Sequence, residues 1–160
     1  MRTDHEISRE SRENRKLRRL GTRSPKCSRC DETDPSALTR RKDGLICYEC
    51  LARSKGRSPI EKHHLAGQHN DSFTIPLPGN DHRILTDFQV DWLIDILRNP
   101  DRSQILKIAA YVQSWLDVQV LIARRLRWIP PFLRRLDSHL AKKLGPDWRK
   151  EMEDSKDDQQ

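Results

Sequence analysis

Residues 27–50 read CSRCDETDPSALTRRKDGLICYEC, and this stretch decides how the chain folds. It contains two C-x2-C pairs, and sixteen residues separate the first pair from the second. The spacing is typical of a zinc site, in which two tight turns aim four thiolates at one ion about 2.3 Å from each sulfur. Four thiolates close a tetrahedral shell. The sequence therefore predicts a structural zinc ion held by Cys27, Cys30, Cys47 and Cys50.

The alternative is that the cysteines form two unrelated redox pairs. A reactive C-x-x-C normally lies beside a βαβ pattern, which this sequence lacks. The N-terminal residues lack the apolar core of a secretory signal, and no continuous apolar run approaches the roughly 18 residues that span a membrane. We therefore expect a cytoplasmic protein with no membrane partner. In a reducing compartment, cysteines bind metal more often than they form disulfides.

The composition explains why a metal is needed. Hydrophobic residues make up 34% of the 160 residues and charged residues another 34%. A chain of this composition cannot bury one large core, so a bound ion has to supply part of the folding energy. The net charge of +7 suits a polyanionic partner, because Lys and Arg displace counterions from phosphates. We expect that partner to be DNA or RNA.

Changes in composition divide the chain into four expected segments. Residues 1–24 are rich in arginine and read as a flexible basic arm. Residues 25–90 contain only short apolar patterns and are rich in turn residues. Residues 91–146 are expected to be helical, and residues 147–160 to form an acidic, disordered tail. The predicted fold class is α+β, with a small zinc-stapled domain followed by a helical C-terminal region.

Apolar residues recur at helical spacing from residue 86 onward. A first helix is expected to begin at Thr86 or Asp87 and to end before Pro100, and a second to span 101–128. Residues 132–144 predict a third helix. The tryptophans and leucines of these helices form either a packing face or a partner surface, which includes the seam of a homodimer through the 101–128 helix.

Histidines concentrate in residues 61–82, EKHHLAGQHNDSFTIPLPGNDH, which hold four of the six in the chain. A neutral imidazole can bind a metal ion, and it can also act as a general base near neutral pH. Adjacent residues of a strand point to opposite sides, so His63 and His64 cannot both ligate one ion from a regular strand. One of them can ligate while the other faces a water molecule.

The two C-x2-C pairs, EKHHLAGQ and TIPLPGNDHRIL together resemble the HNH endonucleases, whose ββα-metal finger has two short strands followed by a helix. The resemblance covers about residues 25–90. It implies metal-dependent hydrolysis of DNA, with His63 and His82 as ligands of a catalytic Mg²⁺ or Mn²⁺ and His64 as the general base. Such an ion would contact a phosphate oxygen and the leaving 3′-oxygen.

The chain departs from the pattern of that family at two points. Pro78 and Asp81 replace two cysteines that complete a zinc shell in many members, but the upstream cysteines already supply four thiolates here. The family also has an asparagine about nine residues before the final ligand, and Phe73 occupies that position. We expect Asn70 or Thr74 to take over the support of the loop, or activity to be weakened.

The remaining polar residues of this stretch leave alternatives open. Asn80 and Asp81 either cap the helix that bears His82 or support catalysis. His69 is expected to be a loop or phosphate-contacting residue rather than a ligand. Two rival functions follow from the same residues. One is a non-catalytic zinc-containing module that binds nucleic acid, and the other is a scaffold for a helical protein-interaction domain.

Overall fold

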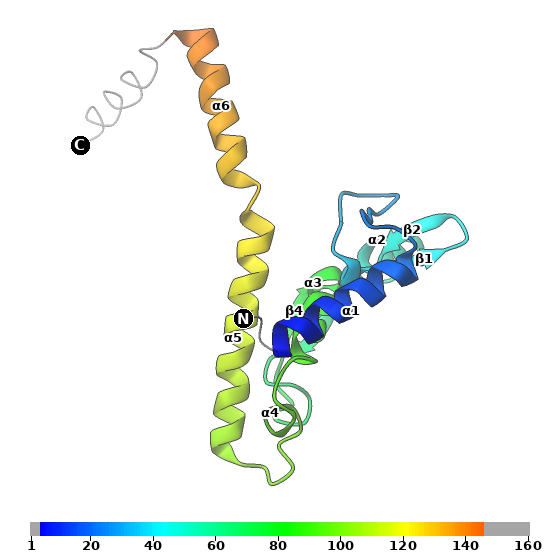
Figure 1. Ribbon diagram of the computed structural model, residues 1–160, viewed down its shortest axis with the longest axis vertical. Helices are drawn as coiled ribbons and strands as arrows, with labels where there is room; N and C mark the ends of the chain where they lie inside the picture. The colour runs from blue at the N-terminus through cyan, green and yellow to red at the C-terminus, as the bar shows by residue number, and fades with distance from the viewer. Residues whose placement is uncertain (1–3, 146–160) are drawn as a thin grey trace, which may run out of the picture. The chain divides into compact units, whose positions relative to one another are not determined.

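The computed structural model describes residues 4–145, with side chains from residue 10 onward, and combines helices with two small antiparallel sheets (Figure 1). The α+β class predicted from the sequence is confirmed. The chain comprises two compact units, residues 1–121 and residues 122–160. The predicted acidic tail over residues 147–160 lies outside the described residues.

The first sheet belongs to a segment that we call the cysteine hairpin, residues 27–54. Its elements are the short 3₁₀ helix η1, the strands β1 and β2, and the helix α2, which span Pro35–Ala37, Leu38–Arg41, Gly44–Cys47 and Tyr48–Ser54. The strands pair antiparallel, with Leu38 opposite Cys47. This pairing places the end of β2, where α2 begins, beside the start of β1.

The second sheet is followed directly by a helix. Strands β3 (Ile60–His64) and β4 (Thr74–Pro78) pair antiparallel, and α3 (Gly79–Gln89) begins at the next residue. Gly79 donates its N–H to the carbonyl of Pro59 at 2.7 Å, and a Cβ at residue 79 would lie 3.1 Å from that oxygen. The close approach favours glycine here. The strand-strand-helix order is the one expected for this segment.

Helices α4 (Ile94–Arg98) and α5 (Gln104–Leu126) follow. The sequence predicted one helix from Thr86 or Asp87 to Pro100, and this prediction is wrong: α3 already contains Thr86 and ends at Gln89, and α4 is a separate helix. The turn between α4 and α5 is fixed by Asn99, a left-handed residue at φ 40° whose side-chain oxygen accepts the N–H of Ser103 at 2.8 Å. The pattern of apolar residues located α5 within the predicted range 101–128, but it merged the end of α3 with α4.

The N-terminal segment forms helix α1 (Asp4–Leu20), so the prediction of a flexible arm over residues 1–24 is wrong. Leu20 is fully buried beside the cysteine hairpin and anchors the end of the helix. Lys16 forms an ion pair with Asp87 of α3. The positive charge that suggested a solvated arm is thus partly satisfied inside the molecule.

Among the described side chains, three small apolar clusters take the place of one core. The first surrounds the cysteines, the second lies between α3 and α5, and the third surrounds Trp92. In the second cluster Leu121 of α5 packs with Ile84 and Phe88 of α3, so the first unit extends past the expected boundary at residue 90. Small separate clusters agree with a composition that cannot support a large core.

In the second unit, α6 spans Ile129–Leu144. Its two prolines lie in the first turn, where no backbone N–H is needed for a helical bond, so the helix begins before Phe132, the start that the sequence predicted. Gly145, at φ 90°, follows the last helical residue, and the predicted end of this helix is confirmed. The rings of Trp128 and Phe132 meet edge to face with centroids 5.6 Å apart.

One stretch within residues 104–144 is long and apolar enough to cross a membrane, judged by length and composition alone. No such stretch was expected from the sequence, because polar residues interrupt every apolar run. Core helices of soluble proteins meet the same criterion but are mostly buried, whereas 17% of this stretch is buried.

Candidate metal centres

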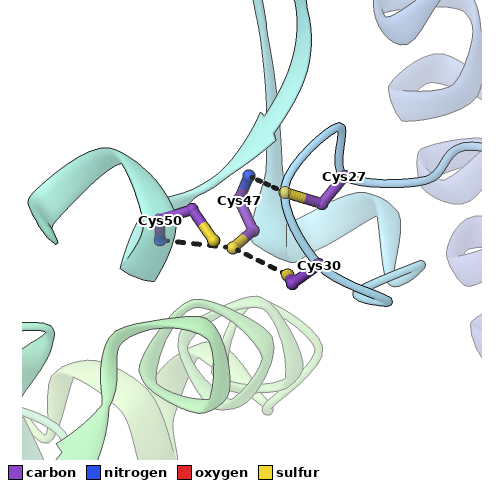
Figure 2. Close-up of side chains that lie close together, drawn as sticks. All are labelled: Cys27, Cys30, Cys47 and Cys50. Carbon is purple, nitrogen blue, oxygen red and sulfur yellow. Dashed lines mark hydrogen bonds between the residues drawn. The ribbon is translucent and has the colours of Figure 1, made fainter. Parts of the chain in front are cut away.

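The four cysteines converge from the two ends of the cysteine hairpin (Figure 2). Cys27 and Cys30 come from the turn before η1, whereas Cys47 ends β2 and Cys50 lies in the first turn of α2. Their four Sγ atoms all lie within 4.8 Å of one another, and the sulfurs of Cys30 and Cys47 are 3.6 Å apart. Ligands about 2.3 Å from one tetrahedral ion lie about 3.8 Å apart. The cysteines are therefore placed to hold a metal ion such as zinc.

Backbone N–H groups point at these sulfurs. Cys27 Sγ accepts from Cys47 at 3.3 Å and from Arg29 at 3.4 Å, and Cys47 Sγ accepts from Cys50 at 3.4 Å. Burial raises the pKa of Cys27, but the N–H donors outweigh that effect and lower its pKa to about 7. Hydrogen bonds of this kind favour the thiolate, which is the form that binds metal.

Asn80 joins the cysteine hairpin to α3. Its side-chain oxygen accepts the N–H of Glu49 at 3.2 Å, and its amide donates to Glu32 at 3.2 Å. Only 5% of Asn80 is exposed, and it is the second residue of α3, where its own N–H donates to Glu49 Oε1 at 3.3 Å. Asn80 is thus neither the helix cap nor a member of the histidine site, the two roles that the sequence left open. It holds the two halves of the unit together.

A second group, which we call the histidine cluster, consists of Glu61, His63, His64 and His82. His63 is 2% exposed, and its ring lies edge-on to that of His82, with centroids 5.2 Å apart. Burial, followed by the charges of His82 and His64, lowers the pKa of His63 to about 4. His63 is therefore neutral at neutral pH, which is the form that can ligate a metal.

His82 is oriented by a residue that the sequence analysis did not select. Its Nδ1 lies 2.5 Å from Glu61 Oε2, and the same carboxylate accepts from Arg83 at 3.1 Å. A carboxylate bound to one ring nitrogen fixes the ring and leaves Nε2 available as a ligand. Glu61 and His63 are two residues apart on β3 and share one face of the strand, but nothing in that spacing indicates the contact with His82 on α3.

His64 points away from His63, as the alternation of a strand requires. It is partly exposed, and its Nδ1 lies 3.1 Å from the backbone carbonyl of Asp71. Thr74, an expected support, is paired opposite His64 in the sheet. With Nδ1 donating to a carbonyl, the lone pair of His64 lies on Nε2.

Asn70 supports the loop that joins β3 to β4. Its amide donates to the carbonyls of Ala66 at 2.9 Å and Ile96 at 2.8 Å, and its oxygen accepts from Asn99 at 2.8 Å. These bonds tie the loop to the end of α4. Among the described residues, no hydrogen bond joins Asn70 to His64. Asn70 therefore supports the loop and does not hold the imidazole directly.

Asp71 connects the same loop to α5. Its Oδ2 accepts from Lys107 Nζ at 2.6 Å and from the hydroxyl of Tyr111 at 2.9 Å, and its Oδ1 accepts the N–H of Phe73 at 2.9 Å. The bonds from Lys107, Phe73 and Tyr111 hold the pKa of Asp71 well below its ordinary value. The carbonyl that orients His64 therefore belongs to a residue whose side chain is fixed by three hydrogen bonds.

Two other residues complete the description of this region. Gln89, at the end of α3, donates to the carbonyl of His64 at 2.9 Å and so ties the helix to the end of β3. His69 is exposed on the loop, outside the histidine cluster. Its position agrees with the loop role that was expected for it.

The cysteine hairpin also presents cations to solvent. A shallow hollow of about 430 Å³ is lined by four basic residues, and Asp43 is the one acid in its lining. We call it the basic hollow; its cations are Arg29, Arg41, Lys42 and Lys55. A surface of this kind suits a phosphate-bearing partner.

The two candidate metal centres differ in their ligands. Among the described residues, the cysteines are the one group of three or more metal-ligating side chains whose ligand atoms all lie within 4.8 Å of one another. The histidine cluster offers two ring nitrogens on one side of β3 and a third, oriented imidazole on the other. A scan against protein-family models, a search of curated proteins and a search of solved structures each found no match to this chain.

Proposed function

We propose that this protein is a metal-dependent endonuclease of the HNH type, which hydrolyses phosphodiester bonds in DNA. One observation carries the proposal: His63 and His64 lie on opposite sides of β3, and the ring of His82 lies beside His63 and not beside His64. His63 is buried against His82, whereas His64 faces outward with its Nδ1 held by a carbonyl. A pair of ligands beside a separately oriented base is the arrangement that hydrolysis at a metal ion needs.

The cysteine site takes a structural Zn²⁺ in this proposal. Four thiolate ligands leave no coordination position for water or substrate, so an ion there holds the fold and does no chemistry. Its energetic role is supported by the small size of the apolar clusters. Zinc binding then supplies stability that the core cannot.

The pair of His63 and His82 fits a second, open site. Neutral His63, whose pKa is lowered to about 4, has one unprotonated ring nitrogen, and a metal ion at its Nε2 would displace the amide of Gln89 that lies 3.4 Å away. Nδ1 of His82 is engaged by Glu61, which leaves Nε2 of that ring as the ligand atom. A Mg²⁺ or Mn²⁺ ion bound there would neutralise charge on the phosphate and on the leaving 3′-oxygen. Two protein ligands leave room for water and substrate.

His64 acts as the general base. Its Nε2 takes a proton from a water molecule as the water oxygen attacks phosphorus and the bond from phosphorus to the 3′-oxygen breaks. The bond from Nδ1 to the Asp71 carbonyl keeps the imidazole in the tautomer that can accept this proton. The released 3′-oxygen takes a proton from solvent.

Asp71 takes the place of the missing family asparagine as the support of the base. Its carbonyl contacts His64, and its side chain is fixed by Lys107 and Tyr111 of α5. Phe73, at the position of that asparagine, contributes only its backbone N–H to the Asp71 side chain. Asp71 is therefore a positioning residue that acts through His64.

A second candidate function is a module that binds nucleic acid without cleaving it. The basic hollow and the net charge of +7 favour it, because they provide affinity for phosphates whether or not the histidine cluster cleaves the nucleic acid. In this reading the zinc-bound hairpin is the grip. The same surface would bind DNA or RNA.

Cleavage of supercoiled plasmid tests the proposal. Zinc-loaded full-length protein is incubated with plasmid and Mg²⁺ or Mn²⁺, next to the variants His64→Ala and His139→Ala. We expect His64→Ala to lower the nicking rate at least about 100-fold, since a general base contributes that much, and we expect the control His139→Ala, at an exposed histidine of α6, to retain the rate.

Nicking that survives His64→Ala, or that never appears with either metal, would sink the enzyme proposal. The binding alternative has its own measurement, the dependence of plasmid affinity on salt. A steep loss of affinity with salt in a protein that never cleaves supports the binding module, and a flat dependence removes the argument from phosphate contacts.

A further inference from the structure

The two faces of α5 differ sharply in exposure. The inner face packs on the first unit through Ala110, Ser114 and Leu121, which are all buried. The opposite face carries large apolar side chains that remain open to solvent. We call this surface the outer stripe; it consists of Ile105 (79% exposed), Ile108 (62%), Val112 (56%), Trp115 (56%), Leu116 (51%) and the exposed Gln119.

The spacing of the outer stripe is that of a coiled-coil seam. Leaving Leu116 aside, its members are separated alternately by three and four residues from Ile105 to Gln119, and the sequence continues the spacing at Ile122 and Leu126. A repeat of 3.5 residues keeps one seam turned toward a neighbouring helix, whereas a stripe that covers a flat surface needs no such regularity. The pattern therefore fits a helix as the partner.

Charge is absent from the outer stripe. Between Gln104 and Ala123 the charged residues of α5 are Lys107 and Asp117, and both are engaged on other parts of the first unit. Lys107 pairs with Asp71, and Asp117 accepts the indole N–H of Trp92 at 2.7 Å. In a chain with a net charge of +7, this is a surface on which two copies can meet without mutual repulsion.

We propose that two copies of this chain associate through the outer stripe, with α5 of one packed against α5 of the other. The exposed fractions correspond to roughly 700 Å² per copy, close to the about 800 Å² per partner that a stable interface buries. A two-fold dimer needs a self-complementary surface, and an uncharged apolar seam satisfies that requirement. Gln119 is the one polar member, and a single polar residue of this kind sets the register of a seam.

Other occupants fit the outer stripe less well. Nucleic acid needs cations, and the stripe has none. A membrane-spanning helix would meet lipid on all sides, whereas the inner face of α5 packs on protein and carries the ion pair of Lys107 with Asp71. A helix that lies on a membrane surface exposes its polar face to water, and the polar face of α5 is engaged instead.

The molar mass of zinc-loaded full-length protein in solution tests the proposal, measured by light scattering and sedimentation over a hundredfold range of concentration. We expect a dimer, and we expect Val112→Glu and Trp115→Glu each to weaken dimerisation at least about 30-fold, since a buried anchor contributes that much. Val120→Glu is the matched control because residue 120 is exposed on the same helix but lies off the stripe. It should remain a dimer.

A gain-of-association variant guards against general damage to the fold. Gln119→Leu should tighten the dimer, because it replaces the polar member of the seam with an apolar one. Zinc content and circular dichroism should be the same in all variants. A wild-type monomer at every concentration, dimers that survive the glutamate substitutions, or equal dissociation by Val120→Glu would overturn the proposal. A wild-type monomer that binds neutral lipid vesicles would assign the stripe to a membrane and overturn it as well.

Discussion

The cysteine hairpin and the histidine cluster lie in the same compact unit, yet they offer a metal ion different numbers of protein ligands. The hairpin presents four sulfurs within 4.8 Å of one another, three of them on buried residues. The cluster presents two histidine rings 5.2 Å apart, and its third histidine turns outward on the other side of the strand. One site can be saturated by protein ligands, and the other cannot.

This difference separates structure from chemistry. A saturated ion contributes folding energy, because its ligands come together only in the folded chain. An unsaturated ion can bind substrate, because water or phosphate has to complete its shell. We therefore expect substitutions at the cysteines to lower stability and substitutions at the histidines to lower the rate of cleavage, with little effect of either group on the other property.

The largest expected effect is the loss of the zinc ion. Cys47 is fully buried, and its sulfur accepts the N–H of Cys50, so Cys47→Ser removes a central ligand. Structural zinc contributes roughly 10–16 kcal/mol, which matches or exceeds the about 5–15 kcal/mol by which domains are stable. We expect the hairpin to unfold, seen as loss of bound zinc and of helical circular dichroism. Ser28→Ala in the same turn is the control, and a folded, zinc-free Cys47→Ser protein would break the comparison.

The next effect concerns the proposed catalytic ion. His63→Ala or His82→Ala should lower plasmid nicking at least about 100-fold while the protein keeps one zinc ion per chain. His139→Ala, at an exposed histidine of α6, is the matched control for the loss of an imidazole away from the cluster. If either substitution at the cluster also released zinc, the two sites would not be independent.

A smaller effect is expected at the support of the base. Asp71→Ala removes the anchor of the carbonyl that holds His64, so kcat should fall about 10-fold while KM for plasmid stays the same. Tyr111→Phe removes one of the anchoring bonds and should cost about 3-fold. Lys107→Arg keeps the cation and should restore most of the activity that Lys107→Met loses. A change confined to KM would assign these residues to substrate binding.

The smallest effect is on stability at acid pH. Unfolded histidine has a pKa of about 6.5, and burial lowers the pKa of His63 to about 4, so the unfolded chain binds more protons between these values. Stability from this residue is complete above pH 6.5 and declines as pH falls toward 4. Relative to His63→Gln, the free energy of unfolding of the wild type should drop by about 1 kcal/mol between pH 7 and 5.5.

Urea unfolding of both proteins at the two pH values measures that difference, and release of zinc affects the pair equally. A difference that does not change with pH would mean that His63 titrates as it does in the unfolded chain. Protons would then compete with a metal ion for the imidazole of His63 near neutral pH.

The sequence predicted the features that depend on neighbouring residues. The four cysteines could be assigned because tetrahedral coordination dictates the spacing within each pair. The opposite orientations of His63 and His64 could be expected because a strand alternates. Both rules act over a few residues, and the structure places these side chains accordingly.

Contacts between distant segments were missed for a common reason. The bond of Asp71 to Tyr111 joins residues 40 apart, and it exists only because α5 packs beside the loop. The contact of Glu61 with His82 likewise depends on how α3 lies against β3. Helix α1 was mistaken for a flexible arm because the acidic partner of Lys16 lies far along the chain. Patterns of charge and spacing do not encode such pairs.

The central claim, that one site is structural and the other catalytic, is tested most directly by removing the weakly held ion alone. Zinc-loaded protein is dialysed briefly against a chelator, its zinc content and circular dichroism are recorded, and plasmid nicking is measured before and after Mg²⁺ or Mn²⁺ is added back. We expect unchanged zinc and fold, no nicking after dialysis, and full recovery with either ion in the wild type but not in His64→Ala. Nicking that persists without added Mg²⁺ or Mn²⁺ while zinc stays bound would contradict the claim.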